Sequence, residues 1–108
     1  MESWDLRTLD IEPHKPQVLL TAEEARAIVI NLPSGEELQE HQTHEAAFLV
    51  VVDGEVDIEQ DGGSTSGGPG LFAHFPANER RRVIAKADTR LLLVLGPWPG
   101  QGHPRRRT

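Results

Sequence analysis

Short apolar runs separated by glycine, proline and aspartate dominate the chain. Between residues 55 and 60, Val56 and Ile58 alternate with three acidic residues, which is the period of a strand with one face in water. The run at 46–52 is almost wholly apolar, so we expect a strand there that is buried on both faces. No long segment has the period of an amphipathic helix, and the chain is predicted to be all-β.

The other strands are predicted where β-branched and aliphatic residues lie between turn residues, at 4–9, 17–20, 25–32, 37–41, 71–75, 81–85 and 89–95. Asp53-Gly54 between two strand-like runs predicts a hairpin, and a second hairpin is expected across residues 86–88. The glycine-rich segment 61–70 carries too little apolar material to pack, which predicts a surface loop. About eight short strands of this kind form a sandwich or a barrel.

Length, charge and composition restrict the classes of protein that remain. The 108 residues fit one domain, 1–108, with a proline- and arginine-rich tail at 96–108. The net charge of -6 argues against a nucleic-acid partner. The absence of cysteine excludes disulfides, thiolate catalysis and cysteine-bound zinc. Neither a signal peptide nor a membrane-spanning apolar run is visible, so we expect a soluble cytoplasmic protein without membrane contact.

The segment that begins at Gly35 resembles the first sequence motif of the cupin superfamily. In that motif a glycine precedes the first histidine by five intervening residues, and a second glycine closes the motif. Gly35, His41 and Gly54 stand at these places. At the family's other two ligand positions this chain has Thr43 in place of a histidine and Ala47 in place of a glutamate.

A second segment resembles the other cupin motif. Gly70 is followed after five residues by Pro76, and Asn78 takes the position of a further glycine. Asparagine tolerates a left-handed backbone nearly as well as glycine does. Arg81 occupies the position of the third histidine. The resemblance covers residues 35–94 and implies a cupin-type double-stranded β-helix, or jelly-roll barrel, that pairs through its sheets as a homodimer.

The substituted ligand positions change what the resemblance implies about chemistry. Alanine cannot bind a metal, threonine is a poor ligand for the metals of cupins, and an arginine places a permanent charge where the cation would lie. We therefore expect a module without metal or other cofactor that binds a small anionic or apolar molecule or has a structural role, rather than an enzyme. The candidate pocket residues are His41, Thr43, Ala47, His74 and Arg81.

Two of these residues have a simpler interpretation as well. His74 lies among apolar neighbours, where a histidine is usually half-buried and hydrogen-bonded without any ligand. Arg81 belongs to the run 80–82, which could be a charged strand edge that discourages aggregation. The functional hypothesis is that Arg81 points into the barrel and binds a carboxylate or phosphate through its fork of donors.

An alternative is a metal-dependent oxygenase or isomerase. His41 and His44 are three residues apart, so they face opposite sides of a regular strand. A β-bulge between them would turn both inward, and with Glu45 they would form an atypical metal site. A metal-free sugar-nucleotide isomerase is a weaker idea, since that chemistry needs a histidine base with a carboxylate partner, and no such pair is evident.

Overall fold

The computed structural model describes residues 1–13, 15–22, 24–41, 45–60 and 62–96, apart from the side chains of 39–41. Strands, and no helix, make up the regular structure of this part of the chain. They are β1 (Gln17–Thr21), β2 (Arg26–Leu32), β3 (Glu37–His41), β4 (Ala46–Asp53), β5 (Val56–Gln60), β6 (Gly63–Gly67), β7 (Phe72–Phe75), β8 (Arg81–Ala85) and β9 (Thr89–Gly96). The prediction of an all-β chain is confirmed.

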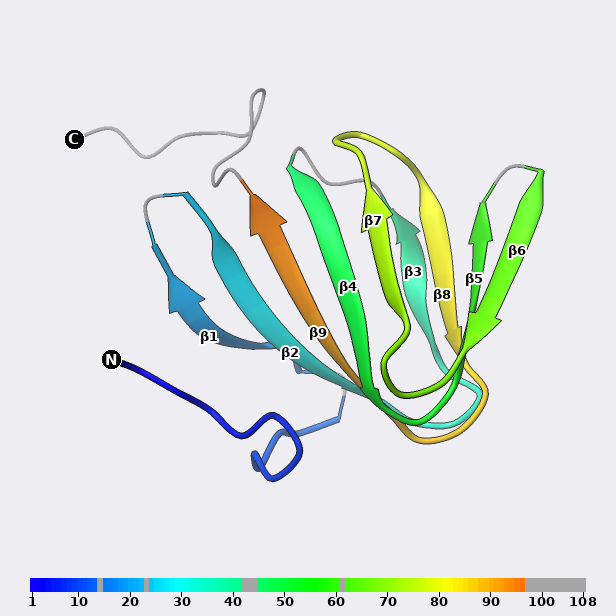
Figure 1. The fold of residues 1–108 in the computed structure, drawn as a ribbon. Coiled ribbons are helices and arrows are strands. Elements are labelled where there is room, and N and C mark those ends of the chain that lie inside the picture. The colour runs from blue at the N-terminus through cyan, green and yellow to red at the C-terminus, as the bar shows by residue number, and fades with distance from the viewer. Residues whose placement is uncertain (14, 23, 42–44, 61, 97–108) are drawn as a thin grey trace.

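The strands form two antiparallel sheets that face each other. One sheet has the order β1-β2-β9-β4-β7 and the other has the order β3-β8-β5-β6. The sheets lie close together at one end and spread apart at the other (Figure 1). Between them lies one apolar core, to which both sheets contribute. This is the double-stranded β-helix that the sequence predicts.

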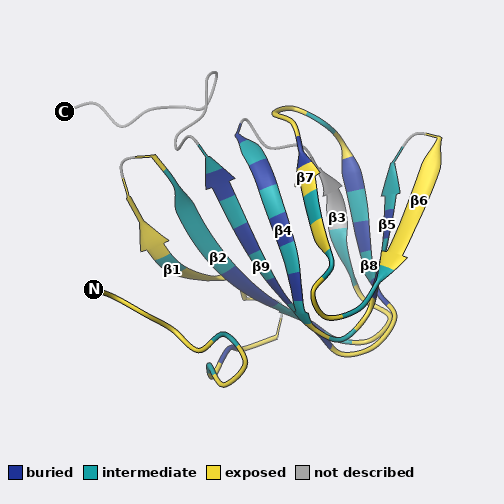
Figure 2. Cartoon of the chain, viewed as in Figure 1, coloured by how far each residue is buried: buried dark blue, intermediate teal, exposed yellow. Residues whose placement is uncertain are grey.

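Burial alternates along the central strands, as a two-sheet core requires. On β4, Ala47, Leu49 and Val51 are buried and point to the core, while the residues between them are only partly buried. The same alternation holds on β8 and β9 (Figure 2). The expectation that the β4 segment is buried on both faces is therefore wrong for the isolated chain, because only its inner face is covered.

Both predicted hairpins are wrong. β4 and β5 belong to different sheets, and so do β8 and β9. The turn at Gly54 does form, with a φ of 96°, but the chain leaves it toward the opposite sheet. A turn signal specifies the local backbone path, whereas the pairing partner is decided by which sheet buries the apolar face. β4 instead pairs with β7 and β9.

Two further elements differ from the expectation. The predicted loop contains β6, which pairs with β5 from Gly63 to Gly67. Its side chains are mostly exposed, so backbone hydrogen bonding rather than burial forms this edge strand. Residues 4–9 form no strand, because Asp5 instead closes a turn. Its side chain accepts a hydrogen bond from the Arg7 amide at 3.0 Å, and its carbonyl accepts one from the Thr8 amide at 3.2 Å.

The motif glycines have left-handed backbone conformations, and so does Asn78, where the motif comparison predicts one. Gly35, Gly54 and Gly70 have φ values of 86°, 96° and 95°, and Asn78 has a φ of 66°. Within the described residues, Asn78 is the one non-glycine residue with a positive φ. The motif glycines thus mark the places where the backbone must turn between the sheets.

Gly54→Ala is expected to lower the free energy of unfolding by about 3 kcal/mol or more. A Cβ at this position would lie 2.4 Å from Thr89 Oγ1 and 2.5 Å from the Asp88 carbonyl oxygen, in addition to the strain of a positive φ. Gly35→Ala is the matched control, because its φ is similar and no atom lies within 4 Å of its added Cβ. Urea denaturation should show a loss of only about 1 kcal/mol for the control. Equal losses would contradict the steric explanation.

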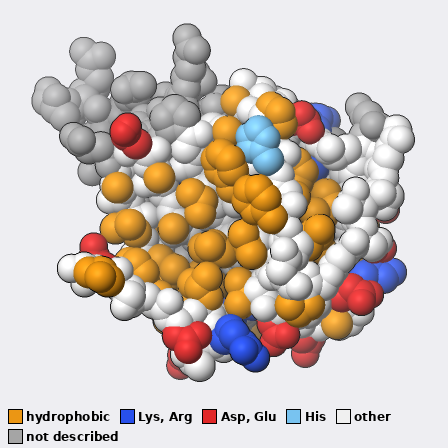
Figure 3. All heavy atoms as spheres, viewed as in Figure 1, with side chains coloured by type: hydrophobic (Ala, Val, Ile, Leu, Met, Phe, Trp, Pro, Cys, Tyr) orange, Lys and Arg blue, Asp and Glu red, His pale blue; other side chains and the backbone are white. Residues whose placement is uncertain are grey.

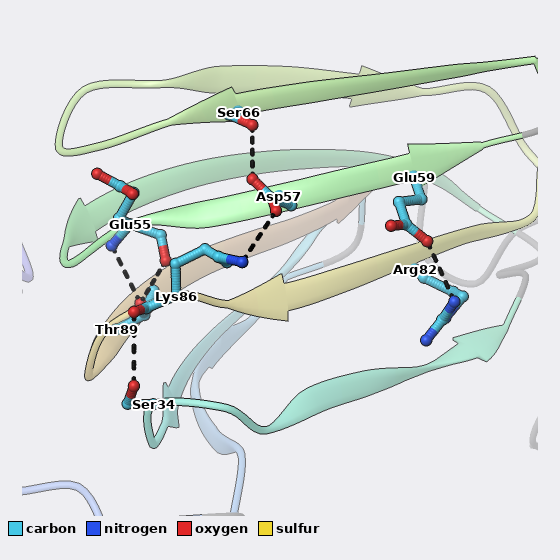
Figure 4. A network of polar contacts seen from close by, with 8 residues as sticks. All are labelled: Ser34, Glu55, Asp57, Glu59, Ser66, Arg82, Lys86 and Thr89. Carbon is cyan, nitrogen blue, oxygen red and sulfur yellow. Dashed lines mark hydrogen bonds and ion pairs between the residues drawn. The ribbon is translucent and has the colours of Figure 1, made fainter.

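The outer faces of the two sheets differ in polarity. On the four-stranded sheet, Arg82 forms ion pairs with Glu37 at 2.7 Å and Glu59 at 3.1 Å. Beside them, Asp57 accepts a hydrogen bond from Ser66 at 2.5 Å and pairs with Lys86 at 3.5 Å (Figure 4). The Ser66 hydroxyl and, more weakly, Lys86 hold the pKa of Asp57 below its ordinary value. This outer face is therefore suited to water.

The outer face of the five-stranded sheet is mainly apolar. The strand register places two rows of paired residues across this face. The first row consists of Ala27, Val94, Phe48 and His74. The second row consists of Val29, Leu92, Val50 and Phe72. Neither row contains an Asp, Glu, Lys or Arg. Phe72 is 59% exposed, and the ring centroids of Phe48 and Phe72 lie 6.3 Å apart. Figure 3 shows hydrophobic side chains spread over this side of the molecule.

Candidate functional site

Arg81 occupies the inner side of the barrel, at the end where β4 and β8 begin. It is 4% exposed and belongs to the same buried series on β8 as Val83 and Ala85. Its guanidinium carbon lies 4.8 Å from the ring centroid of Phe75. Phe75 is itself buried and pairs with Ala47 across the β4–β7 ladder. A cation, an aromatic ring and a small residue thus meet at this end of the core.

The guanidinium of Arg81 has few polar contacts for so buried a charge. Its hydrogen bond to the Glu79 carbonyl oxygen is long, at 3.4 Å, and among the described residues no carboxylate forms an ion pair with it. Burial lowers the pKa of Arg81, and the charge of Glu79 acts in the opposite direction. An arginine stays protonated at neutral pH even so. Among the described residues, the Glu79 carbonyl oxygen is the one acceptor that its five donors reach.

The other residues predicted for this end lie partly outside the described structure. The backbone of His41 pairs with that of Arg81, after a register irregularity between Leu38 and His41. The side chain of His41, and Thr43 and His44 altogether, lie outside the described residues. Glu45 is 2% exposed and precedes Ala47 by two positions, so it continues the inward series of β4.

His74 is not brought to this group. It is exposed and lies on the outer face, with its ring centroid 4.9 Å from that of Phe48. The alternation of β7 explains the placement, since Phe75 points into the core and the residue before it must point out. Of the apolar sequence neighbours that made His74 a pocket candidate, Ala73 and Phe75 face the core, whereas Phe72 lies on the outer face with His74.

The described residues at the family's ligand positions do not fit a metal ion. Ala47 is 0% exposed and has no donor atom, and Arg81 is a buried cation. Among the residues that the structure describes, no three His, Asp or Glu side chains are grouped so that they could hold a metal. The set of His41, His44 and Glu45 falls partly outside those residues, so it stays a hypothesis.

A pocket that no sequence motif indicates lies at the opposite end of the barrel. It has a volume of about 340 Å³ and is bounded by the N-terminal segment, the end of β2 and the start of β9. Its charged lining residues are Arg7, Asp53, Asp88 and Arg90. These residues are far apart in the sequence and follow no motif, so only the fold brings them together.

The architecture and the motif positions define the class of this protein, a small jelly-roll domain with an atypical cupin ligand set. The cupin domain family matches residues 28–95, and the chain belongs to that family. None of the curated proteins matches the chain in sequence. Within the described residues, no helix is long and apolar enough to cross a membrane.

Solved structures of cupins share the fold at low sequence identity. An RmlC-like cupin from Desulfovibrio desulfuricans is 20% identical, with a TM-score of 0.79 over 90% of this chain and 97% of that one. A cupin superfamily protein from Desulfitobacterium hafniense is 14% identical, with a TM-score of 0.76 over 85% and 86%. The Cnp3 cupin domain of Schizosaccharomyces pombe is 16% identical, with a TM-score of 0.76 over 88% and 73%. These likenesses establish the fold alone.

Proposed function

We propose that this cupin domain is a metal-free module that binds a small anionic ligand inside the barrel through Arg81. The observation that carries the proposal is that Arg81 is 4% exposed as a residue and its guanidinium lacks a carboxylate ion pair among the described residues. Removing a charge from water without a partner is unfavourable by several kcal/mol. A ligand carboxylate or phosphate would accept two parallel hydrogen bonds from the fork and offset that penalty.

The surroundings of Arg81 indicate the shape of the ligand. Phe75 lies under the guanidinium, and the neighbouring inward positions, Ala47 and Val83, are small or apolar. Such walls offer dispersion contacts but few hydrogen bonds. The proposed ligand is therefore a small molecule with one anionic group and an apolar remainder. Separately, we propose that the protein is cytoplasmic.

Titration with benzoate, acetate and inorganic phosphate tests the proposal. We expect benzoate or phosphate to shift the Nε–Hε resonance of Arg81 in 15N-resolved NMR spectra, with benzoate binding more tightly than acetate because its ring adds apolar contact. In Arg80→Met, which removes the exposed neighbouring cation, the shifts should persist. In Arg81→Met, binding should disappear. If no anion perturbs Arg81, or if both variants lose binding equally, the proposal is wrong.

A metal-dependent enzyme is the second candidate, favoured by one observation. Glu45 is 2% exposed at the end where the backbone of His41 pairs with that of Arg81, so the third member of the set with His41 and His44 is a buried carboxylate. Metal analysis of protein purified without a histidine tag separates the two candidates. A stoichiometric metal that is lost in His41→Ala would support the enzyme and contradict the metal-free module.

We also propose that two copies pair through the apolar outer face of the five-stranded sheet. An antiparallel sheet with one face in water normally alternates apolar and polar side chains, as β5 does with its ion-paired outer residues. β4 and β9 instead carry apolar residues on both faces. A homodimer formed by sheet-on-sheet contact would remove this surface from water.

A further inference from the structure

The pocket at the end of the barrel opposite Arg81 is held in place by the N-terminal segment. The Asn31 side-chain amide donates to the Ile11 carbonyl at 2.7 Å. Arg90 donates through Nε to Asn31 Oδ1 at 2.8 Å and through Nη1 to the Leu6 carbonyl at 2.9 Å. Pro13 forms a backbone bridge with Asn31. The segment is thus fastened to β2 and β9 at several points, and the pocket is preformed.

Four charged side chains line this pocket without pairing with one another. Arg7 and Arg90 supply positive charge, and Asp53 and Asp88 supply negative charge, yet no ion pair between these residues is present. Opposite charges that share a small pocket and stay separate leave both kinds of group available to a third molecule.

The four charged side chains still have unused donors and acceptors after their hydrogen bonds within the protein are formed. Arg90 uses Nε and Nη1, so Nη2 is not used. The side chain of Arg7 forms no hydrogen bond or ion pair with another described residue. One oxygen of Asp88 accepts from the Ser34 amide at 2.9 Å, and one oxygen of Asp53 accepts from the Gly54 amide at 3.1 Å. The second oxygen of each carboxylate is not used.

We infer that this pocket binds a small zwitterion of the α-amino acid class. The carboxylate of the ligand would contact the two arginines, and its ammonium group would contact the two aspartates. A simple anion would be repelled by the aspartates and a simple cation by the arginines, so the balanced lining selects a molecule that carries both charges. The inference does not depend on the ligand proposed for Arg81.

The size and the remaining walls of the pocket fit this class of ligand. A volume of about 340 Å³ lies at the lower end of the range for small-molecule sites. Pro13, Leu32 and Pro33 also line the pocket and supply apolar contact for a short side chain. A free amino acid therefore fits better than a nucleotide or a sugar phosphate.

NMR titration of the full chain with L-alanine, and with acetate and methylammonium as half-ligands, tests the inference. L-Alanine at millimolar concentrations should shift the backbone amides of Asn31, Leu32, Ser34 and 88–90, and each half-ligand should bind about tenfold more weakly or worse, since it lacks one charge-assisted contact. Equal binding of acetate, or no shift with L-alanine, L-leucine or L-glutamine, would overturn the inference.

Conservative variants localise the binding. Arg7→Gln and Asp88→Asn should each weaken L-alanine binding about tenfold, and Asp88→Asn keeps an oxygen to accept from the Ser34 amide, so the turn is preserved. Lys15→Gln and Glu36→Gln are the matched controls, since both residues are exposed and lie outside the pocket lining. Arg81→Met should leave L-alanine binding unchanged, which separates this site from the anion site. Full binding in both pocket variants would overturn the inference.

Discussion

Replacing Arg81 with methionine is expected to make the ligand-free protein more stable and to abolish anion binding. The guanidinium is buried on the inner face of β8 with one long hydrogen bond and no carboxylate ion pair among the described residues. Substituting apolar side chains of similar volume for buried charges often raises stability by about 1–4 kcal/mol. The contact with Phe75 would be retained, because a methionine thioether also packs well against an aromatic ring.

Chemical denaturation of the two arginine variants measures this effect. Arg81→Met should shift the urea midpoint upward in the absence of anions, whereas Arg80→Met should leave it nearly unchanged, since Arg80 is exposed. Adding benzoate or phosphate should stabilise the wild type and Arg80→Met but not Arg81→Met. A variant at position 81 that is less stable than the wild type without ligand would show that the charge is satisfied inside the protein.

Leu92→Lys is expected to convert the proposed homodimer into a monomer. Leu92 lies at the centre of the second outer row, where it pairs with both Val29 and Val50. A lysine here would place two unpaired charges in an apolar contact when two copies meet, at a cost of several kcal/mol. The dissociation constant should therefore rise at least about a hundredfold, as measured by sedimentation velocity over a range of concentrations.

Two further variants make this experiment decisive. Phe72→Lys changes a residue that is already 59% exposed, so it should weaken the dimer without affecting the fold of the monomer. Ser64→Lys is the control on the other sheet, where Ser64 is exposed on β6 opposite Glu59, and it should leave the assembly unchanged. A wild-type chain that sediments as a monomer at all accessible concentrations would refute the proposed pairing.

The strands and the main turns could be predicted because their signals are local. β-branched and aliphatic runs marked β2, β4, β8 and β9 to within a residue or two. The motif offsets identified Gly35, Gly54, Gly70 and Asn78 as the positions where the backbone turns. β6 could not be found in this way, because the sequence Gly63–Gly67 carries no apolar residue and the strand depends on the free backbone edge of β5.

The candidate site was only partly predictable, for a related reason. The inward position of Arg81 follows from its spacing with Val83 on β8, and its ligand-binding role stays a prediction. His74 was misleading because the face to which a strand's apolar residues belong depends on a register that sequence alone does not specify. The charged lining of the second pocket could not be predicted at all, since Arg7 and Arg90 are far apart in the sequence and line the same pocket only in the folded chain.

The order of the strands also has a consequence for how the chain folds. Among the described strands, six of the eight connections between consecutive strands lead from one sheet to the other, and only β1–β2 and β5–β6 pair with their neighbour in sequence. Each layer is therefore assembled from strands that are separated in the sequence by strands of the other layer. Such a high contact order implies slow folding, on the millisecond-to-second scale, through a transition in which both layers form together. It also implies that damage to one layer unfolds the whole domain in a single cooperative step.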